Sequence, residues 1–113
     1  MTVDDATLLG TVDDLRAGLR AGEFTVRELT EASLDRLERV GPELNAVVTV
    51  TRERALSAAD ELDAELAAGE DRGPLHGVPF GVKDLLAVAG HPTTWGAAPL
   101  ADREREGTAT VET

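Results

Sequence analysis

The amino-acid composition of this chain changes at Gly73, and this change limits which secondary structure each part can form. Apolar residues recur at helical spacing before this point, whereas glycine and proline are frequent after it. Because proline and glycine disfavour helix interiors, we predict a mainly helical segment over residues 1–72, followed by a strand and a loop over residues 73–96. A chain of 113 residues has room for one domain but not for two.

The helical part is predicted to begin with two amphipathic helices. Thr11 opens a capping box, which marks a helix start, and Gly22 is a suitable helix end. Thr25 opens a second capping box, and the apolar stripe behind it continues to Gly41 and Pro42. Proline disfavours a helical conformation in the residue before it, so the second helix is expected to end there.

A third helix is expected from about Arg52 to Ala68, closed by Gly69, and the run Ala46–Val50 before it predicts a short strand. Gly107–Thr113 looks like the beginning of another helix. The predicted apolar faces are Val12, Leu15 and Leu19 in the first helix; Val26, Leu29, Ser33, Leu37 and Val40, with Leu34 beside them, in the second; and Ala55, Ala59, Leu62 and Leu66 in the third.

Residues 78–83 are predicted to form a strand that ends in the only lysine of the chain. Alternate side chains of a strand point to opposite faces, so Val78, Phe80 and Val82 would share one face and Lys83 would lie on the other, beside small residues. A charged lysine that faces a packed interior is costly, and burial favours its neutral form. A neutral lysine can act as a base.

The same residues allow two further interpretations of Lys83. Lys83 and Asp84 could open an exposed turn, since most lysines are solvated surface charges. A phosphate-binding P-loop is excluded because it needs glycine directly before the lysine and Ser or Thr directly after it, whereas Val82 precedes Lys83 and Asp84 follows it. The sequence pattern alone therefore allows Lys83 to be either a catalytic base or a solvated surface charge.

Composition limits the classes of function. The net charge of −11 repels phosphate backbones and anionic lipid, so no direct nucleic-acid binding and no membrane binding are expected. The lack of cysteine excludes disulfides and a thiol nucleophile. The acidic N-terminus lacks an apolar leader, so we expect a cytoplasmic protein. The sequence has two Phe, one Trp and no Tyr, so few large side chains are available to fill a hydrophobic core. We therefore expect further protein to pack around this chain.

One segment is similar to a known motif. Residues 73–84 read GPLHGVPFGVKD, and residues 90–94 read GHPTT. Together they resemble the opening motif of the amidase signature family, in which Leu-His-Gly-(Ile/Val)-Pro precedes (Val/Ile)-Lys-Asp and then Gly-x-Pro-Thr-Thr. Leu44–Val50 and Gly107–Val111 are similar to other stretches of that family, so the resemblance covers nearly the whole chain.

The resemblance implies an α/β fold, a mixed sheet surrounded by helices. Residues 1–113 would be the N-terminal part of a single amidase domain, a truncated piece that supplies a helical layer and the first strands. In this family a serine attacks the amide carbonyl, a second serine on a cis peptide bond relays the proton, and a lysine is the base. Lys83 matches that catalytic lysine, and no metal or other cofactor is implied.

The implied function is an amide-bond hydrolase acting on small carboxamides, with a small-molecule amide substrate and the remainder of the amidase domain as partners. One alternative is the A subunit of a glutamine-hydrolysing, tRNA-dependent amidotransferase, and another is a non-catalytic truncated remnant or interaction module. Ser33 and Ser57 lie in predicted helices and match neither family serine, so the 113-residue chain alone is expected to be inactive.

The other polar residues of the motif are expected to have structural roles, in local hydrogen bonds, backbone contacts and turns: Asp84, His76, His91, Thr93 and Thr94. Trp95 departs from the small residue that commonly follows Thr-Thr in the family, which leaves the subfamily and the substrate open.

Overall fold

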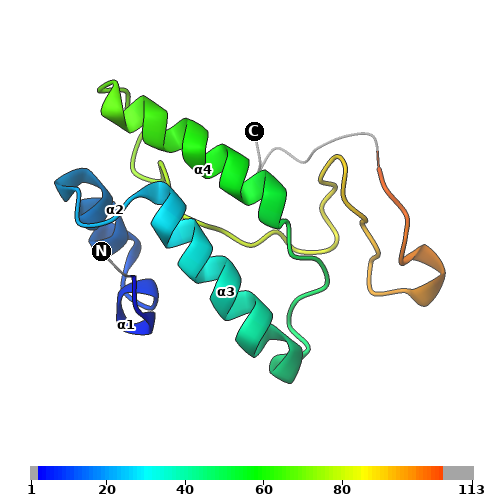
Figure 1. Cartoon of the computed structure of the whole chain (residues 1–113). Helices are drawn as coiled ribbons and strands as arrows, with labels where there is room; N and C mark the ends of the chain where they lie inside the picture. Colours follow the sequence, from blue (N-terminus) through cyan, green and yellow to red (C-terminus); the bar gives the residue numbers. More distant parts are fainter. Residues whose placement is uncertain (1–2, 106–113) are drawn as a thin grey trace. The chain divides into compact units, whose positions relative to one another are not determined.

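The structure, a computed structural model, describes residues 3–105, which belong to two compact units, Met1–Pro79 and Phe80–Thr113. The described part of the first unit contains α1 (Asp5–Leu8), α2 (Val12–Ala21), α3 (Val26–Leu44) and α4 (Arg52–Ala67). The described part of the second contains a short 3-10 helix, η1 (Ala98–Leu100). Figure 1 shows α3 and α4 side by side, and α1 contacts both α2 and α3.

The N-termini of α2 and α3 are capped as their sequences predict. The Thr11 hydroxyl accepts the backbone N–H of Asp14 at 3.1 Å, and the Asp14 carboxylate accepts the N–H of Thr11 at 3.3 Å, which completes a capping box. The Thr25 hydroxyl accepts the N–H of Glu28 at 3.0 Å. Gly22 ends α2 with a φ of 73°, a left-handed conformation that costs glycine little.

Helix α3 continues through Pro42 to Leu44, so the prediction that Gly41 and Pro42 end it is wrong. The proline ring clashes with the Cβ of the preceding residue, and Gly41 has no Cβ. Pro42 also lies in the last turn, where its missing N–H removes a single intrahelical hydrogen bond. The helix ends instead at Asn45, which adopts a left-handed conformation with a φ of 50°.

Helix α1 was not predicted, because four residues are too short to show an apolar period. Asp4 caps it by accepting the N–H of Thr7 at 2.8 Å. Asp5 binds Arg36 and Arg39 of α3, and the hydrogen bond from Arg36 is the main reason that the pKa of Asp5 is lowered. These ion pairs attach α1 to α3.

The apolar core of the first unit lies between α2, α3 and α4. The predicted face of α2 is confirmed at Leu15 and Leu19, which are buried with Ala59 of α4, but it is wrong at Val12, which is 45% exposed; Leu62 and Leu66 of α4 pack at the edge of the core. The buried side chains of the core are Leu15, Leu19, Phe24, Val26, Leu29 and Ala59.

The second half of α3 buries a different face from the one predicted. Leu34 and Gly41 are buried there, whereas Leu37 is 42% exposed. Val47 lies close to Gly41, where an added Cβ would be 3.0 Å from the Val47 Cγ2. The chain that returns toward α4 therefore covers the Gly41 face and leaves Leu37 in contact with water.

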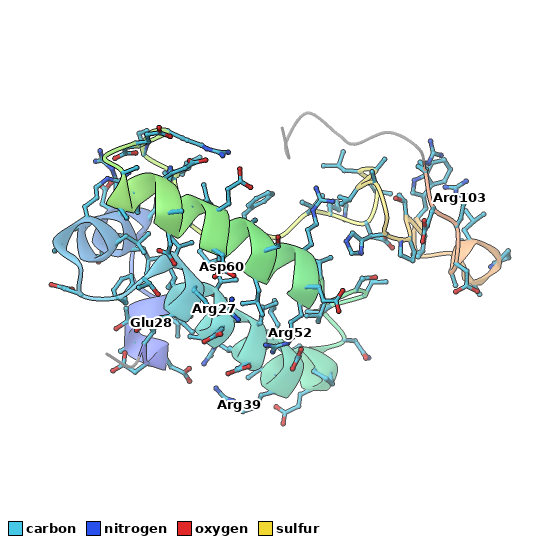
Figure 2. All side chains as sticks on the ribbon, turned by 45° about the horizontal axis from the view of Figure 1, so that its top comes forward. Arg27, Glu28, Arg39, Arg52, Asp60 and Arg103 are labelled. Carbon is cyan, nitrogen blue, oxygen red and sulfur yellow. The ribbon has the colours of Figure 1, made fainter. Side chains whose placement is uncertain are left out.

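The N-terminus of α3 receives part of its cap from α4. The Asp63 carboxylate accepts the backbone N–H groups of Val26 at 2.8 Å and Arg27 at 3.0 Å. The Arg27 guanidinium in turn donates to the Asp60 carboxylate at 2.7 and 2.9 Å, and Figure 2 shows these two side chains on the adjacent helices. With Thr25 accepting the next N–H, the first three donors of α3 all have partners.

No β-strand is present in residues 3–105, and the predicted strands at Ala46–Val50 and at residues 78–83 are irregular there. A strand needs a neighbour that supplies ladder hydrogen bonds, and the β-type pairing of the described residues is a single bridge between Pro92 and Glu104. The helical part of the expected α/β fold is therefore present without its sheet. The helix predicted at Gly107–Thr113 lies outside the described residues.

Candidate active site

His76 attaches the first half of the motif to α4. Its side chain is buried, with the residue 5% exposed, and its Nδ1 accepts the N–H of Arg72 at 3.1 Å. The proton is therefore on Nε2, which donates to the backbone carbonyl of Leu62 at 3.0 Å. The predicted backbone contacts of a loop histidine are confirmed for His76. Both ring nitrogens are occupied, so this imidazole is not available as a base or as a metal ligand.

Gly77 allows the motif backbone to contact the core directly. It is buried with a φ of 84°, and a Cβ at this position would lie 2.7 Å from the Val26 Cγ2 and 3.1 Å from the Leu19 Cδ1. Both the backbone conformation and the available space therefore require glycine. The His-Gly pair of the motif is an attachment to the helices rather than part of the chemistry.

An ion pair marks the point where the helical part ends and the motif begins. Arg20 of α2 donates from Nε and from one terminal nitrogen to the two Asp71 carboxylate oxygens, each at 2.7 Å, and to the Gly73 carbonyl at 2.8 Å. Asp71 also accepts the N–H of Gly73 at 2.9 Å. The Arg20 hydrogen bond, followed by that of Gly73, lowers the pKa of Asp71 to about 2.

Lys83 is exposed and lies in an irregular segment of the second unit. Its carbonyl accepts the N–H of Leu86 at 2.9 Å, so it opens a turn, and its amine makes no hydrogen bond or ion pair with the described residues. The strand and the burial predicted for Lys83 are thus absent in residues 3–105. Neither of two surface hollows in the first unit is lined by Lys83.

Asp84, the neighbour of Lys83, is held by residues ten and eleven positions further along the chain. Its carboxylate accepts the N–H of Thr94 at 2.8 Å and also the Thr94 hydroxyl, and its carbonyl accepts the N–H of Trp95 at 3.2 Å. The Thr94 hydrogen bonds lower the pKa of Asp84, the hydroxyl contributing most. We call these contacts the Asp84–Thr94 clamp. They confirm that Asp84 fixes local hydrogen bonds and that Thr94 shapes a turn.

The residues beside the clamp have mainly backbone roles. Thr93 is 1% exposed and its N–H donates to the Arg103 carbonyl at 2.7 Å, but its buried hydroxyl has no hydrogen-bond partner among residues 3–105. The N–H of His91 donates to the Val88 carbonyl at 3.2 Å, which closes a turn. Thr93 thus differs from Thr94, because the Thr94 hydroxyl makes hydrogen bonds and the Thr93 hydroxyl makes none with residues 3–105.

Trp95 has a role that the sequence did not predict. It has a φ of 55°, and the guanidinium carbons of Arg103 and Arg105 lie 4.2 and 4.5 Å from its ring centroid. Arg103 is labelled in Figure 2. The contact arises because the hydrogen bond from Thr93 to Arg103 brings the two segments alongside each other. Sequence spacing carries no signal for such a pairing.

Serines, metal-ligand groups and membrane-spanning helices are the other features that could indicate a function in residues 3–105. Ser33 lies within α3 and Ser57 within α4, as predicted. Among residues 3–105, no three His, Cys, Asp or Glu side chains are grouped so that they could hold a metal ion. Within the same residues, no helix combines the length and the apolar character that crossing a bilayer requires.

Known proteins are similar to this chain over most of its length. A family profile described as Amidase matches residues 28–112. An acylamidase from Rhodococcus erythropolis is 43% identical over 98 residues, which cover 87% of this chain and 20% of that protein. The A subunit of the glutamyl-tRNA(Gln) amidotransferase of Alkalilimnicola ehrlichii is 50% identical over 90 residues, which cover 80% of this chain and 18% of that protein.

Solved structures agree with the sequence matches. The native peptide amidase from Stenotrophomonas maltophilia superimposes with a TM-score of 0.78 at 39% identity, over 87% of this chain and 20% of that chain. The chain therefore spans about one fifth of the length of these relatives. On the profile that matches three quarters of its residues, and on the motif around Lys83, the chain belongs to the Amidase family.

Proposed function

We propose that this chain is the N-terminal part of a longer amidase that hydrolyses the amide bonds of small carboxamides. The observation that carries the proposal is the Amidase match over residues 28–112, which include Lys83 within its motif. Relatives named acylamidase and peptide amidase support the reaction class. Residues 1–72 and 73–96 would then be the helical layer and the lysine-bearing segment of one catalytic domain, in a cytoplasmic protein.

Lys83 is proposed as the base of this reaction. A neutral amine can accept the proton of a nucleophilic serine through the hydroxyl of a second serine, and can later return it to the leaving amine. The exposed position of Lys83 leaves its amine accessible to serines supplied by the rest of the protein. Covering by that protein would remove water, and desolvation favours the uncharged form that the base requires.

Apolar side chains near Lys83 in the sequence support the idea that more protein covers this segment. Phe80, on the predicted apolar face of this segment, is 65% exposed, and Leu85 is 54% exposed. Burying these two side chains against further protein would be favourable, since it removes apolar surface from water. We propose that residues 78–83 join a mixed sheet when neighbouring strands of the domain are present, because ladder partners would then exist.

An amidotransferase A subunit is the second candidate, because five relatives with this name are 43–50% identical to the chain over 90 residues. Such a protein would release ammonia from glutamine and would need partner subunits. A non-catalytic truncated remnant or interaction module is the third candidate, and a genuine stop codon after Thr113 would favour it.

The discriminating experiment begins with the coding sequence that follows Thr113. We expect a glycine-rich stretch that contains two serines, and we expect the protein from the complete reading frame to release ammonia from simple carboxamides. Lys83→Ala and Lys83→Arg should each lower kcat by about 10³-fold or more, since arginine keeps the charge but cannot act as a base. Asp102→Ala, at an exposed position, is the control.

Two results would overturn the proposal. One is a stop codon directly after Thr113 in the native gene, and the other is full activity of the Lys83→Ala protein. Glutamine hydrolysis that appears only with partner subunits, without turnover of simple carboxamides, would identify the amidotransferase instead.

A further inference from the structure

We propose that Thr94 is a positioning residue for Lys83, because it hydrogen-bonds the carboxylate of the neighbouring Asp84 and fixes the backbone from which Lys83 projects. This inference rests on the proposed function, in which Lys83 is the base. It assigns a specific task to a threonine that lies eleven residues from the lysine in the sequence.

Hydrogen bonds hold the backbone on the C-terminal side of Lys83. The Asp84 carbonyl accepts the N–H of Trp95 at 3.2 Å, and the Lys83 carbonyl accepts the N–H of Leu86 at 2.9 Å. The carbonyl groups of both Lys83 and Asp84 are therefore held by backbone hydrogen bonds. On the other side, Gly81 has no neighbouring atom within 4 Å of an added Cβ, so it is not packed in the described structure. The position of Lys83 depends mainly on the Asp84–Thr94 clamp.

The charge of Asp84 affects the protonation of a neighbouring lysine. A carboxylate on the residue next to a catalytic lysine would stabilise the ammonium form, which cannot act as a base. In the structure the Asp84 carboxylate accepts the Thr94 N–H at 2.8 Å and the Thr94 hydroxyl, and it makes no ion pair with Lys83. Thr94 is 7% exposed, so these bonds are shielded from competing water. The Asp84 carboxylate is thus hydrogen-bonded to Thr94 and not to the lysine amine.

The adjacent threonine provides a matched control for the clamp. Thr93 and Thr94 are both buried, but the Thr93 hydroxyl has no hydrogen-bond partner in the described residues, whereas the Thr94 hydroxyl donates to Asp84 and accepts the N–H of Gly96 at 3.1 Å. Thr→Val conserves the side-chain volume and removes the hydroxyl. Thr94→Val therefore removes the hydroxyl hydrogen bonds to the Asp84 carboxylate and from the Gly96 N–H but keeps the backbone bond from the Thr94 N–H, whereas Thr93→Val removes no observed contact.

The structural test uses the 113-residue chain. Hydrogen exchange of the Trp95 amide, followed by NMR, should become about tenfold or more faster in Thr94→Val, which is the scale of a lost hydrogen bond to a charged group. In Thr93→Val the exchange rate should stay within about twofold of the original chain, since no bond is lost. Equal exchange rates in the two variants would overturn the clamp as the anchor of this segment.

The functional test uses the protein from the complete reading frame. Thr94→Val should lower kcat about tenfold with a nearly unchanged KM, and Thr94→Ser, which retains the hydroxyl, should recover most of the loss. The acid limb of the pH–rate profile should move to higher pH in Thr94→Val, because an Asp84 carboxylate that keeps one hydrogen bond instead of two can turn toward the lysine amine and favour its protonated form. A purely structural role would not move this limb.

The outcomes separate the two proposals. If Lys83→Ala keeps its activity, the proposed function fails. If Lys83→Ala is inactive but Thr94→Val has the original kcat and pH–rate profile, the positioning role fails while the proposed function stands. Loss of kcat in Thr94→Val without rescue by Thr94→Ser would also overturn the role assigned to the hydroxyl.

Discussion

The carboxylate of Asp63 accepts the backbone N–H of Val26, the first residue of α3, at 2.8 Å. Asp63 belongs to α4 and lies 37 residues further along the chain, so one helix caps the start of another. Its second oxygen accepts the N–H of Arg27 at 3.0 Å. This double cap joins the two helices that bound the core of the first unit.

Asp63→Ala is expected to lower the free energy of unfolding of the 113-residue chain by about 1–2 kcal/mol, because two helix N–H groups lose their acceptor. Urea titration followed by circular dichroism measures this change. Asp60→Ala, one turn earlier on α4, removes only an exposed contact to Arg27 and should cost clearly less. Equal losses in the two variants would argue against the capping role.

His76→Ala is expected to lower the free energy of unfolding by about 2 kcal/mol. The substitution leaves the N–H of Arg72 without its acceptor and removes the imidazole from a buried site. His91→Ala is the comparison, since His91 is only partly buried and its observed hydrogen bond uses the backbone. The urea midpoint should therefore fall more in His76→Ala than in His91→Ala, and equal midpoints would contradict the role assigned to His76.

Gly77→Ala should destabilise the chain more than Gly69→Ala. Both glycines have a positive φ, of 84° and 83°, so both substitutions carry a backbone cost of about 1 kcal/mol. At Gly77 the new methyl group would also lie 2.7 Å from the Val26 Cγ2, whereas no atom lies within 4 Å at Gly69. The difference between the two thermal midpoints isolates the steric effect of close contact with the core.

The stability of the first unit is expected to fall as the pH decreases from about 4 to about 2. The pKa of Asp71 in the folded chain is lowered to about 2 by Arg20 and by the N–H of Gly73, whereas an unfolded aspartate titrates near 3.8. A lowered pKa stabilises the fold above the unfolded value, and this contribution disappears as the pH falls through the folded value. Urea midpoints measured across this range should show the decline.

Asp71→Asn and Arg20→Gln should each make that pH dependence shallower, since either change removes the ion pair. The double variant should be no shallower than the single variants, because the two side chains act together. Added salt should also weaken the effect, since Asp71 is exposed to solvent. A pH dependence that is unchanged in Asp71→Asn would contradict this assignment.

The purified 113-residue chain is expected to release no measurable ammonia from carboxamides. It holds Lys83 but its two serines lie within α3 and α4, where they match no family serine. As a positive control, the chain is mixed with the separately produced remainder of the domain, and ammonia release is expected in that mixture. Turnover by the chain alone that disappears in Lys83→Ala would refute the prediction.

Local interactions made several elements predictable from sequence. The capping residues Thr11 and Thr25 and the left-handed Gly22 lie within a few positions of the groups that they satisfy. The motif around Lys83 identified the family for the same reason, since its residues are consecutive. Pro42 shows the limit of a local rule, because the absence of a Cβ on the preceding glycine decided that α3 continues.

Tertiary structure alone decided the contacts between distant residues. Asp63 caps α3, His76 bonds to the Leu62 carbonyl, and Thr94 holds Asp84, and none of these pairs follows from a period or from a motif. Neighbours along the chain were enough to predict where α2 and α3 start, most of the buried positions of α2 and α4, and the family that the chain resembles. Which polar group satisfies which depends on packing in three dimensions, where hydrogen-bond geometry and burial select the partner.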